Sequence, residues 1–190
     1  MAFTALPYNV ALGDHGGQQQ GSRRRRIQND ALPAEQREAF VRGWSRNLLA
    51  NVDGALYICM STKEWPVVSR VMADSGAHWS DTIIWAKDRF VLGRAFYQRQ
   101  YEPIWFGWRE GAKPYWCGDR DQGDVWKVDR PSASNLHPTM KPLPLIERAL
   151  GRDQRAARAQ EEIEHRVASL RAVLDRALNQ RQRLHRRVQV

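Results

Sequence analysis

The stretch Phe3-Thr4-Ala5-Leu6-Pro7-Tyr8-Asn9-Val10 lies close to the start of the chain, and the rest of the sequence is organised around it. Its apolar residues Phe3 and Leu6 predict a short buried strand that runs into a Pro-Tyr turn. Such a strand presents an aromatic ring and backbone carbonyls at the carboxyl edge of a sheet, which is where open α/β folds bind ligands. Short Pro-aromatic turns are also common structural features, so the remaining sequence decides which role applies.

Buried strands alternate with amphipathic helices between residues 33 and 85. We expect a helix over 33–51, because Phe40, Trp44 and Leu48 repeat every four residues. Residues 55–60 form a continuous apolar run, as in a strand covered on both faces. A second helix is expected over 63–75 and another buried strand over 81–85. This alternation predicts an α/β fold with a mostly parallel sheet and helices on its faces.

The segment from 101 to 135 changes character at residue 109. Residues 101–108 resemble a strand, and Pro103 favours a place near the sheet edge because proline cannot donate to a ladder. From 109 to 135 Gly, Asp, Pro and Ser become frequent, and Trp116 and Trp126 stand among charged residues. Basic residues mixed with aromatics suit contact with nucleic acid, and they equally suit a small hairpin that packs its own tryptophans.

The chain is basic, with a formal net charge of +9 and a pI of about 10.1 over 190 residues. This balance favours a polyanionic partner, nucleic acid before an acidic membrane surface. Arg23, Arg24, Arg25 and Arg26 follow the polar, Gly-rich segment 13–22. Such a run is often only a solvated surface, but guanidinium groups beside the Pro-Tyr edge are suited to phosphate contact.

Cysteine usage and hydropathy indicate a soluble, cytoplasmic protein. The two cysteines, Cys59 and Cys117, are far apart and have no CxxC spacing or nearby histidine pair, so we expect no metal site. No apolar run approaches the length of a membrane span, and the N-terminus has no signal-peptide pattern.

Residues 151–190 predict a long, Arg-rich helix. Gln160, Val167, Leu174, Arg181 and Val188 share one heptad position, and Ala156, Ile163, Leu170, Ala177 and Leu184 share another. This narrow apolar seam is typical of a coiled coil, although Gln160 and Arg181 interrupt it. A single helix packed on the domain is an equally good interpretation.

Two stretches together resemble one family. FTALPYNV (3–10) and LHPTMKPLPLIERAL (136–150) resemble the DNA amino-methyltransferases of the N-4/N-6 type, in the subgroup whose catalytic motif precedes its cofactor motif. GALYICMS (54–61), TIIWAKD (82–88) and YEPIWFGWR (101–109) resemble successive strands of its sheet. The resemblance covers residues 1–150 and implies a partial Rossmann-like methyltransferase sheet with helices on both faces, a target-recognition insert at 109–135, and a separate C-terminal helix at 151–190.

The catalytic turn of that family usually reads Asp-Pro-Pro-Tyr. The resemblance implies that Tyr8 stacks on a base flipped out of double-stranded DNA and that Leu6 and Pro7 belong to the catalytic turn. A side-chain oxygen and the next backbone carbonyl would hold the target amine. Here Ala5 replaces the acidic residue, and losing one such acceptor typically lowers the rate about a hundredfold to a thousandfold. We therefore expect strong impairment.

The cofactor of the family is S-adenosylmethionine. By the resemblance, the residues facing it are His137, Pro138, Thr139 and Lys141. The family's Gly-rich loop, expected shortly after HPTMKP, has no counterpart before the Arg-rich helix, so the donor site is incomplete in this sequence.

These observations predict a DNA-binding protein of the amino-methyltransferase family, impaired in methyl transfer. The DNA-contacting candidates are Arg23, Arg24, Arg25, Arg26, Trp116 and Trp126. Two alternatives stay open: one half of a split methyltransferase, with a partner supplying the cofactor loop, and a non-enzymatic module that binds DNA and oligomerises. A homodimer or a partner protein would pair through 151–190.

Overall fold

The structure is a computed structural model. It describes residues 1–11, 27–92, 95–112, 114, 120–131, 140–152, 154, 155, 158, 161, 162, 164, 165, 167 and 168. Its elements are β1 (Ala2–Ala5), α1 (Ala34–Asn51), β2 (Leu56–Cys59), α2 (Trp65–Asp74), β3 (Ala77–Val91), β4 (Arg99–Arg109) and β5 (Val125–Lys127). A further helix begins at residue 143 and is continuous to 152.

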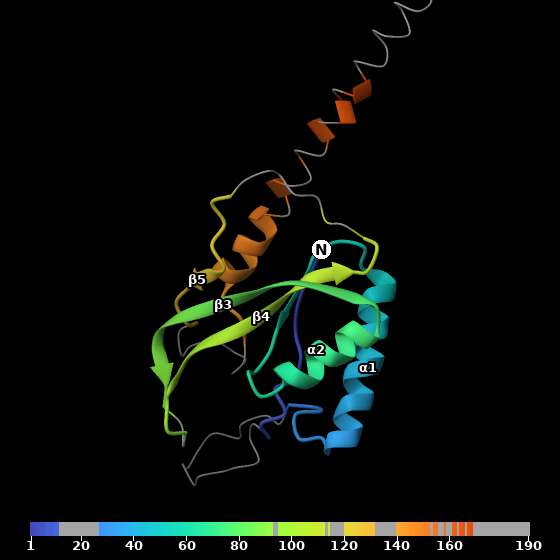
Figure 1. Ribbon diagram of the computed structural model, residues 1–190. Helices are drawn as coiled ribbons and strands as arrows, with labels where there is room; N and C mark the ends of the chain where they lie inside the picture. Colours follow the sequence, from blue (N-terminus) through green and yellow to red (C-terminus); the bar gives the residue numbers. More distant parts are fainter. Residues whose placement is uncertain are drawn as a thin grey trace, which may run out of the picture.

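The five strands form one sheet in the order β1-β2-β4-β3-β5 (Figure 1). β1 pairs with β2 in parallel, and β3 pairs with β5 in parallel. β4 is antiparallel to both of its neighbours, β2 and β3. The expectation of a mostly parallel sheet is therefore wrong, because β3 and β4 are joined directly as a hairpin, and a hairpin connection gives antiparallel strands.

β4 lies inside the sheet, so the edge position expected from Pro103 is also wrong. The carbonyl oxygen of Pro103 accepts a hydrogen bond from the Met60 nitrogen at 3.3 Å. In a strand, the N–H and the C=O of one residue point to the same side. The N–H that Pro103 lacks would therefore face Met60, which follows Cys59, the last residue of β2. The proline is tolerated because β2 stops there.

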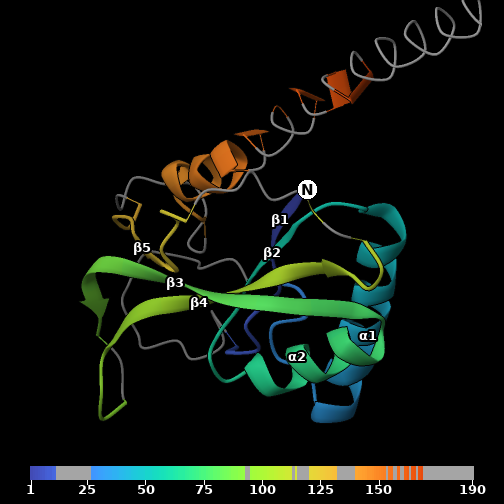
Figure 2. The ribbon, with the colours of Figure 1, turned by 45° about the horizontal axis from the view of Figure 1, so that its top comes forward.

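Hydrophobic side chains cover both faces of the sheet. On one face, α1 and α2 pack on Leu56, Ile58 and Trp105. On the other face, Leu145 and Ala149 of the helix 143–152 join a cluster that includes Tyr57 and Phe106. Figure 2 shows this helix and the pair α1 and α2 on opposite sides of the sheet. The expected α/β sheet with helices on both faces is confirmed.

The buried stripe of α1 is shifted by one residue from the expected one. Its buried residues are Arg37, Val41, Ser45 and Leu49. The expected stripe of Phe40, Trp44 and Leu48 is only partly buried, beside the same core. Arg37 is thus a buried residue that the apolar pattern of the sequence did not predict.

The hairpin of β3 and β4 extends beyond the helices, as Figure 1 shows. Its register shifts between Ala86, which faces Tyr101, and Val91, which faces Arg99. The extra residues of β3 form a bulge, where a strand bends and twists more strongly. The side-chain amide of Gln100 donates to the carbonyl oxygen of Lys87 at 3.1 Å inside this bulge.

The C-terminal segment is described only in part. Every described residue from 154 to 168 is helical and exposed. Val167 is the only expected seam residue among them, and the other heptad positions lie outside the described residues. The coiled coil stays a prediction. None of the helices in the described ranges has the length and apolar character needed to cross a membrane.

Candidate functional site

The Pro-Tyr turn follows the carboxyl end of β1, as expected. Ala5 is the last residue of β1 and lies beside Cys59 of β2 in a parallel ladder. Leu6 is buried in the core, whereas Ala5 is exposed. The turn then directs Tyr8 toward β4, where the site is built.

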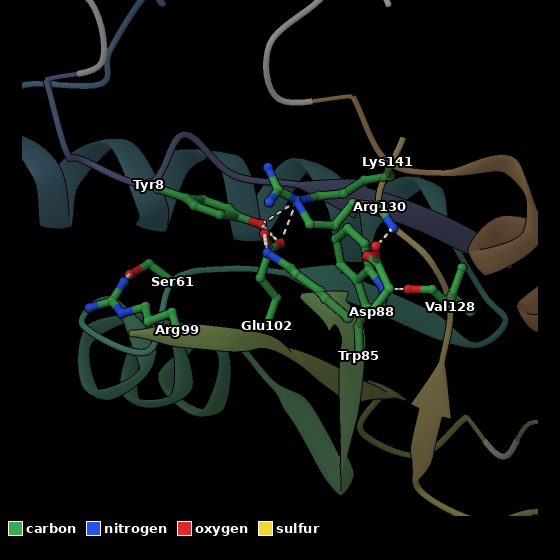
Figure 3. Close-up of polar contacts among 10 residues, drawn as sticks. Tyr8, Ser61, Trp85, Asp88, Arg99, Glu102, Val128, Arg130 and Lys141 are labelled. Atoms are coloured by element: carbon green, nitrogen blue, oxygen red, sulfur yellow. Dashed lines mark hydrogen bonds and ion pairs between the residues drawn. The ribbon is translucent and has the colours of Figure 1, made fainter. Parts of the chain in front are cut away.

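A cluster of polar side chains, which we call the Tyr8 site, joins residues from four parts of the chain (Figure 3). The hydroxyl of Tyr8 donates to Oε2 of Glu102 at 2.5 Å. The Nζ atom of Lys141 lies 2.5 Å from that same oxygen and 2.5 Å from the Tyr8 hydroxyl oxygen. Lys87 donates to Oε1 of Glu102 at 2.7 Å. Both oxygens of the carboxylate therefore already accept hydrogen bonds.

Aromatic rings enclose the two ammonium groups. Lys141 Nζ lies 4.7 Å from the centre of the Tyr8 ring and 5.4 Å from that of the Trp85 ring. Lys87 Nζ lies 4.7 Å from the Trp85 ring centre. The Trp85 ring is fixed by its Nε1, which donates to the Val128 carbonyl oxygen at 2.7 Å. Such cation–π contacts add to the ion pairs where water is excluded.

The charges of the Tyr8 site explain its protonation. Burial alone would raise the pKa of Glu102, but Lys141 and then Lys87 outweigh it, and the pKa is lowered. Burial, the Glu102 carboxylate and Cys59 raise the pKa of Tyr8 far above its ordinary value. Glu102 is thus ionised and Tyr8 keeps its proton near neutral pH. The site offers a ring, a carboxylate and two cations, which suit stacking and hydrogen bonding of a planar polar group.

Arg37 of α1 fixes the turn from behind. Its Nη2 donates to the Pro7 carbonyl oxygen at 2.6 Å, and its Nε pairs with Oε2 of Glu64 at 2.6 Å. The guanidinium is buried, and Arg37 Nη1 has no hydrogen-bond partner among the described residues. The position of Tyr8 therefore depends on a buried ion pair between α1 and the start of α2.

The segments on either side of residues 12–26 are joined by their own hydrogen bonds. Asn9 and Leu32 exchange two, from Asn9 Nδ2 to the Leu32 carbonyl oxygen at 3.2 Å and from the Leu32 nitrogen to Asn9 Oδ1 at 2.7 Å. The Ala11 nitrogen donates to the Asp30 carbonyl oxygen at 2.8 Å. Asp30 is buried here, and no side chain caps α1, which begins after Pro33.

The structure brings together two of the stretches that the sequence singles out. Tyr8 of FTALPYNV meets Lys141 of HPTMKP, 133 positions away. Trp126 is buried in β5, with its ring 5.9 Å from that of Tyr57, which agrees with the packing alternative for this tryptophan. The other predicted site residues lie outside the described residues: Arg23, Arg24, Arg25, Arg26, Trp116, His137, Pro138 and Thr139.

Four residues near the turn were not predicted: Arg37, Trp85, Lys87 and Glu102. A signal existed for Glu102, which is the charged residue within the otherwise apolar and aromatic run 101–108. Lys87 lies two residues after the end of the strand expected over 81–85. Nothing local in the sequence marks Arg37 as buried. No group of His, Cys, Asp or Glu in the described part of the chain is arranged to hold a metal ion.

Comparisons with known proteins give a likeness in fold. No protein-family profile and no curated protein matches the sequence. Among solved structures, the chain is similar to the crystal structure of an M1.HpyAVI–SAM complex, with a TM-score of 0.52 and 17% identity. The match covers 78% of this chain and 64% of that one, so this chain spans less than two thirds of its neighbour. A crystal structure of M1.HpyAVI matches at a TM-score of 0.47 and 15% identity.

At this level of identity the likeness shows the fold. The chain has a methyltransferase-like α/β fold, built on a mixed five-stranded sheet. The carboxyl ends of β1 and β2, where the Tyr8 site lies, are the edge at which such folds bind ligands.

Proposed function

We propose that this chain is a DNA-binding domain of the N-4/N-6 amino-methyltransferase type in which methyl transfer is strongly impaired. One observation carries the proposal: Tyr8 and Lys141, from the two family-like stretches, meet in the Tyr8 site at the carboxyl edge of a methyltransferase-like sheet. The net charge of +9 supports a nucleic-acid partner. In this proposal the Tyr8 ring stacks on a displaced base.

Impairment follows from what stands beside the ring. Ala5 occupies the position of the family's acid and has no side-chain oxygen for the target amine. Glu102 does bring a carboxylate to Tyr8, but both of its oxygens accept hydrogen bonds from Tyr8, Lys141 and Lys87. These three donors leave at most about one lone-pair site of the carboxylate, on Oε1, for an amine.

SAM is the cofactor that the fold implies, and M1.HpyAVI was crystallised with it. The described residues fit it incompletely. Lys141 lies at the carboxyl edge of the sheet, but no Gly of the described residues lies in the Tyr8 site to form a backbone cradle. These residues alone therefore do not form a donor site, and no transfer step follows from them.

A split enzyme is the second candidate, and the edge of the sheet favours it. β1 pairs only with β2 among the described strands, so its other edge is unpaired there. Open strand edges are ready to pair with another chain. A partner that adds strands beside β1 would also place its own loops next to Tyr8. SAM binding that requires such a partner distinguishes this candidate from the first.

The base-stacking role is tested with two short labelled duplexes, one matched and one with a central mismatch. A mismatched base is more easily displaced, so the wild-type chain should bind the mismatched duplex several-fold more tightly. Tyr8→Ala should lose this preference, and Tyr8→Phe, which keeps the ring, should retain it. Equal preference in all three chains would contradict the role of Tyr8.

Impairment is tested by incubating the chain with methyl-labelled SAM and the same duplexes. We expect no transfer above background. Robust transfer would contradict the proposal and point to Glu102 as a substitute acceptor, in which case Glu102→Ala, which removes both acceptor oxygens, should abolish it.

A further inference from the structure

The free end of the hairpin between β3 and β4 exposes a group of large apolar side chains. Leu92 is 83% exposed, Tyr97 is 90% exposed and Phe96 is fully exposed. Phe90 and Tyr101 of the same hairpin are also exposed. We call residues 89–92 and 95–101 the hairpin arm. Figure 1 shows this end of the hairpin projecting away from α1 and α2. Several large apolar side chains exposed together usually mark an interaction surface.

Charge indicates the kind of partner. The hairpin arm contains Arg89 and Arg99 and no acidic residue. The Arg89 side chain is 66% exposed and lies 3.6 Å from Asp88, and Arg99 donates to the Ser61 hydroxyl at 3.3 Å. Rings beside arginines suit nucleic acid, because bases stack on the rings and phosphates pair with the cations. An interface with another protein would not need this excess of positive charge.

The hairpin arm begins at the Tyr8 site. Lys87 and Glu102, which belong to that site, are the residues of β3 and β4 from which the arm extends. A strand rises about 3.3 Å per residue, so Phe90 lies roughly 10 Å along the chain from Lys87. A two-stranded β-ribbon has the width that the major groove of DNA admits. The bulge between Ala86 and Val91 bends the ribbon just beyond the site.

We propose that the hairpin arm binds duplex DNA, with Phe96 and Tyr97 stacking on bases next to the one presented to Tyr8. This inference rests on the proposed function, because it places the arm and the Tyr8 site on one DNA duplex. Side chains that wedge between base steps unstack and bend DNA, which would help to displace a neighbouring base.

The test measures Kd for a fluorescein-labelled mismatched duplex by anisotropy, with the full chain, over a series of salt concentrations. The double variant Phe96→Ser, Tyr97→Ser should bind about tenfold to a hundredfold more weakly, with an unchanged salt slope, because the lost contacts are uncharged. Arg89→Gln should instead reduce the salt slope by about one. The ring-preserving double variant Phe96→Tyr, Tyr97→Phe should bind like the wild type.

Trp79→Ser is the matched control, since Trp79 is an exposed aromatic residue elsewhere on β3. It should leave Kd unchanged. Circular dichroism checks that each variant is folded, as expected for exposed side chains. If the serine double variant binds DNA as well as the wild type does, the arm is not a DNA contact, while the proposed function stands. If the wild-type chain binds no DNA, both proposals fail.

Sedimentation velocity tests whether the hairpin arm is instead a contact between copies of this chain. A wild-type chain that self-associates through the arm would become monomeric in the serine double variant. That result, with unchanged DNA affinity, would overturn the inference and assign the arm to a protein interface.

Discussion

The Nη2 atom of Arg37 lies 2.6 Å from the carbonyl oxygen of Pro7, so the helix α1 holds the turn that carries Tyr8. Only 2% of Arg37 is exposed, and its second partner is the carboxylate of Glu64. A methyltransferase-like sheet alone therefore does not fix the turn. The buried guanidinium of Arg37 also contributes to the position of the turn.

Replacing this cation should be costly. Arg37→Met leaves a buried carbonyl and the Glu64 carboxylate without their donor, and we expect unfolding in urea to be easier by about 3 kcal/mol. Arg70→Met is the control, because Arg70 pairs with Glu38 at 2.6 Å but on the surface. Its urea midpoint should stay within error of the wild type. Equal effects of the two variants would contradict the buried role of Arg37.

Acid should weaken the fold through Glu102. Its pKa is lowered from 4.5 in the folded state, because Lys141 and Lys87 outweigh the effect of burial. A lowered folded pKa stabilises the fold above the unfolded value, and this stabilisation is lost as the pH falls from 4.5 through the folded pKa. Glu102→Gln should be less stable at neutral pH, and the difference from the wild type should shrink in that acidic range. A constant difference would show that the carboxylate charge does not matter.

Cys59 should be inert to thiol reagents in the folded chain. Burial raises the pKa of its thiol to about 12, and the side chain is 0% exposed. At about pH 8 the thiolate fraction is then on the order of one in ten thousand. With Cys117→Ser removing the other thiol, a coloured disulfide reagent should react only after urea is added. Fast reaction without urea would mean that the β2 region opens readily.

Two glycines should respond in opposite directions to alanine. A Cβ on Gly107 of β4 would overlap the His78 carbonyl oxygen, so Gly107→Ala should destabilise by about 1–3 kcal/mol. A Cβ on Gly43 of α1 meets nothing within 4 Å, so Gly43→Ala should stabilise by roughly 0.5–1 kcal/mol. Thermal unfolding of both variants checks the pair. A tolerated Gly107→Ala would show that β3 and β4 can separate at this point.

An element of this fold could be predicted where its sequence pattern lies within one continuous segment. α1 and β2 could be predicted because their apolar residues repeat over a long segment or form a continuous run. The place of β4 could not, since it depends on β2 ending beside Pro103, and the proline alone favoured an edge. Tyr8 and Lys141 were both predicted site residues from their motifs. The pairing of Lys141 with Glu102 was not, because the two are 39 positions apart and belong to different elements.

The hydrogen bonds of Asn9 with Leu32, and of Ala11 with Asp30, have a consequence for variation in length. They hold the two ends of the connection 12–26 close together whatever lies between them. Each doubling of such a connection would cost only about 0.6 kcal/mol of closure entropy. Insertions or deletions of residues there should leave Tyr8 in place, so this connection can change in length while the sheet behind it stays the same.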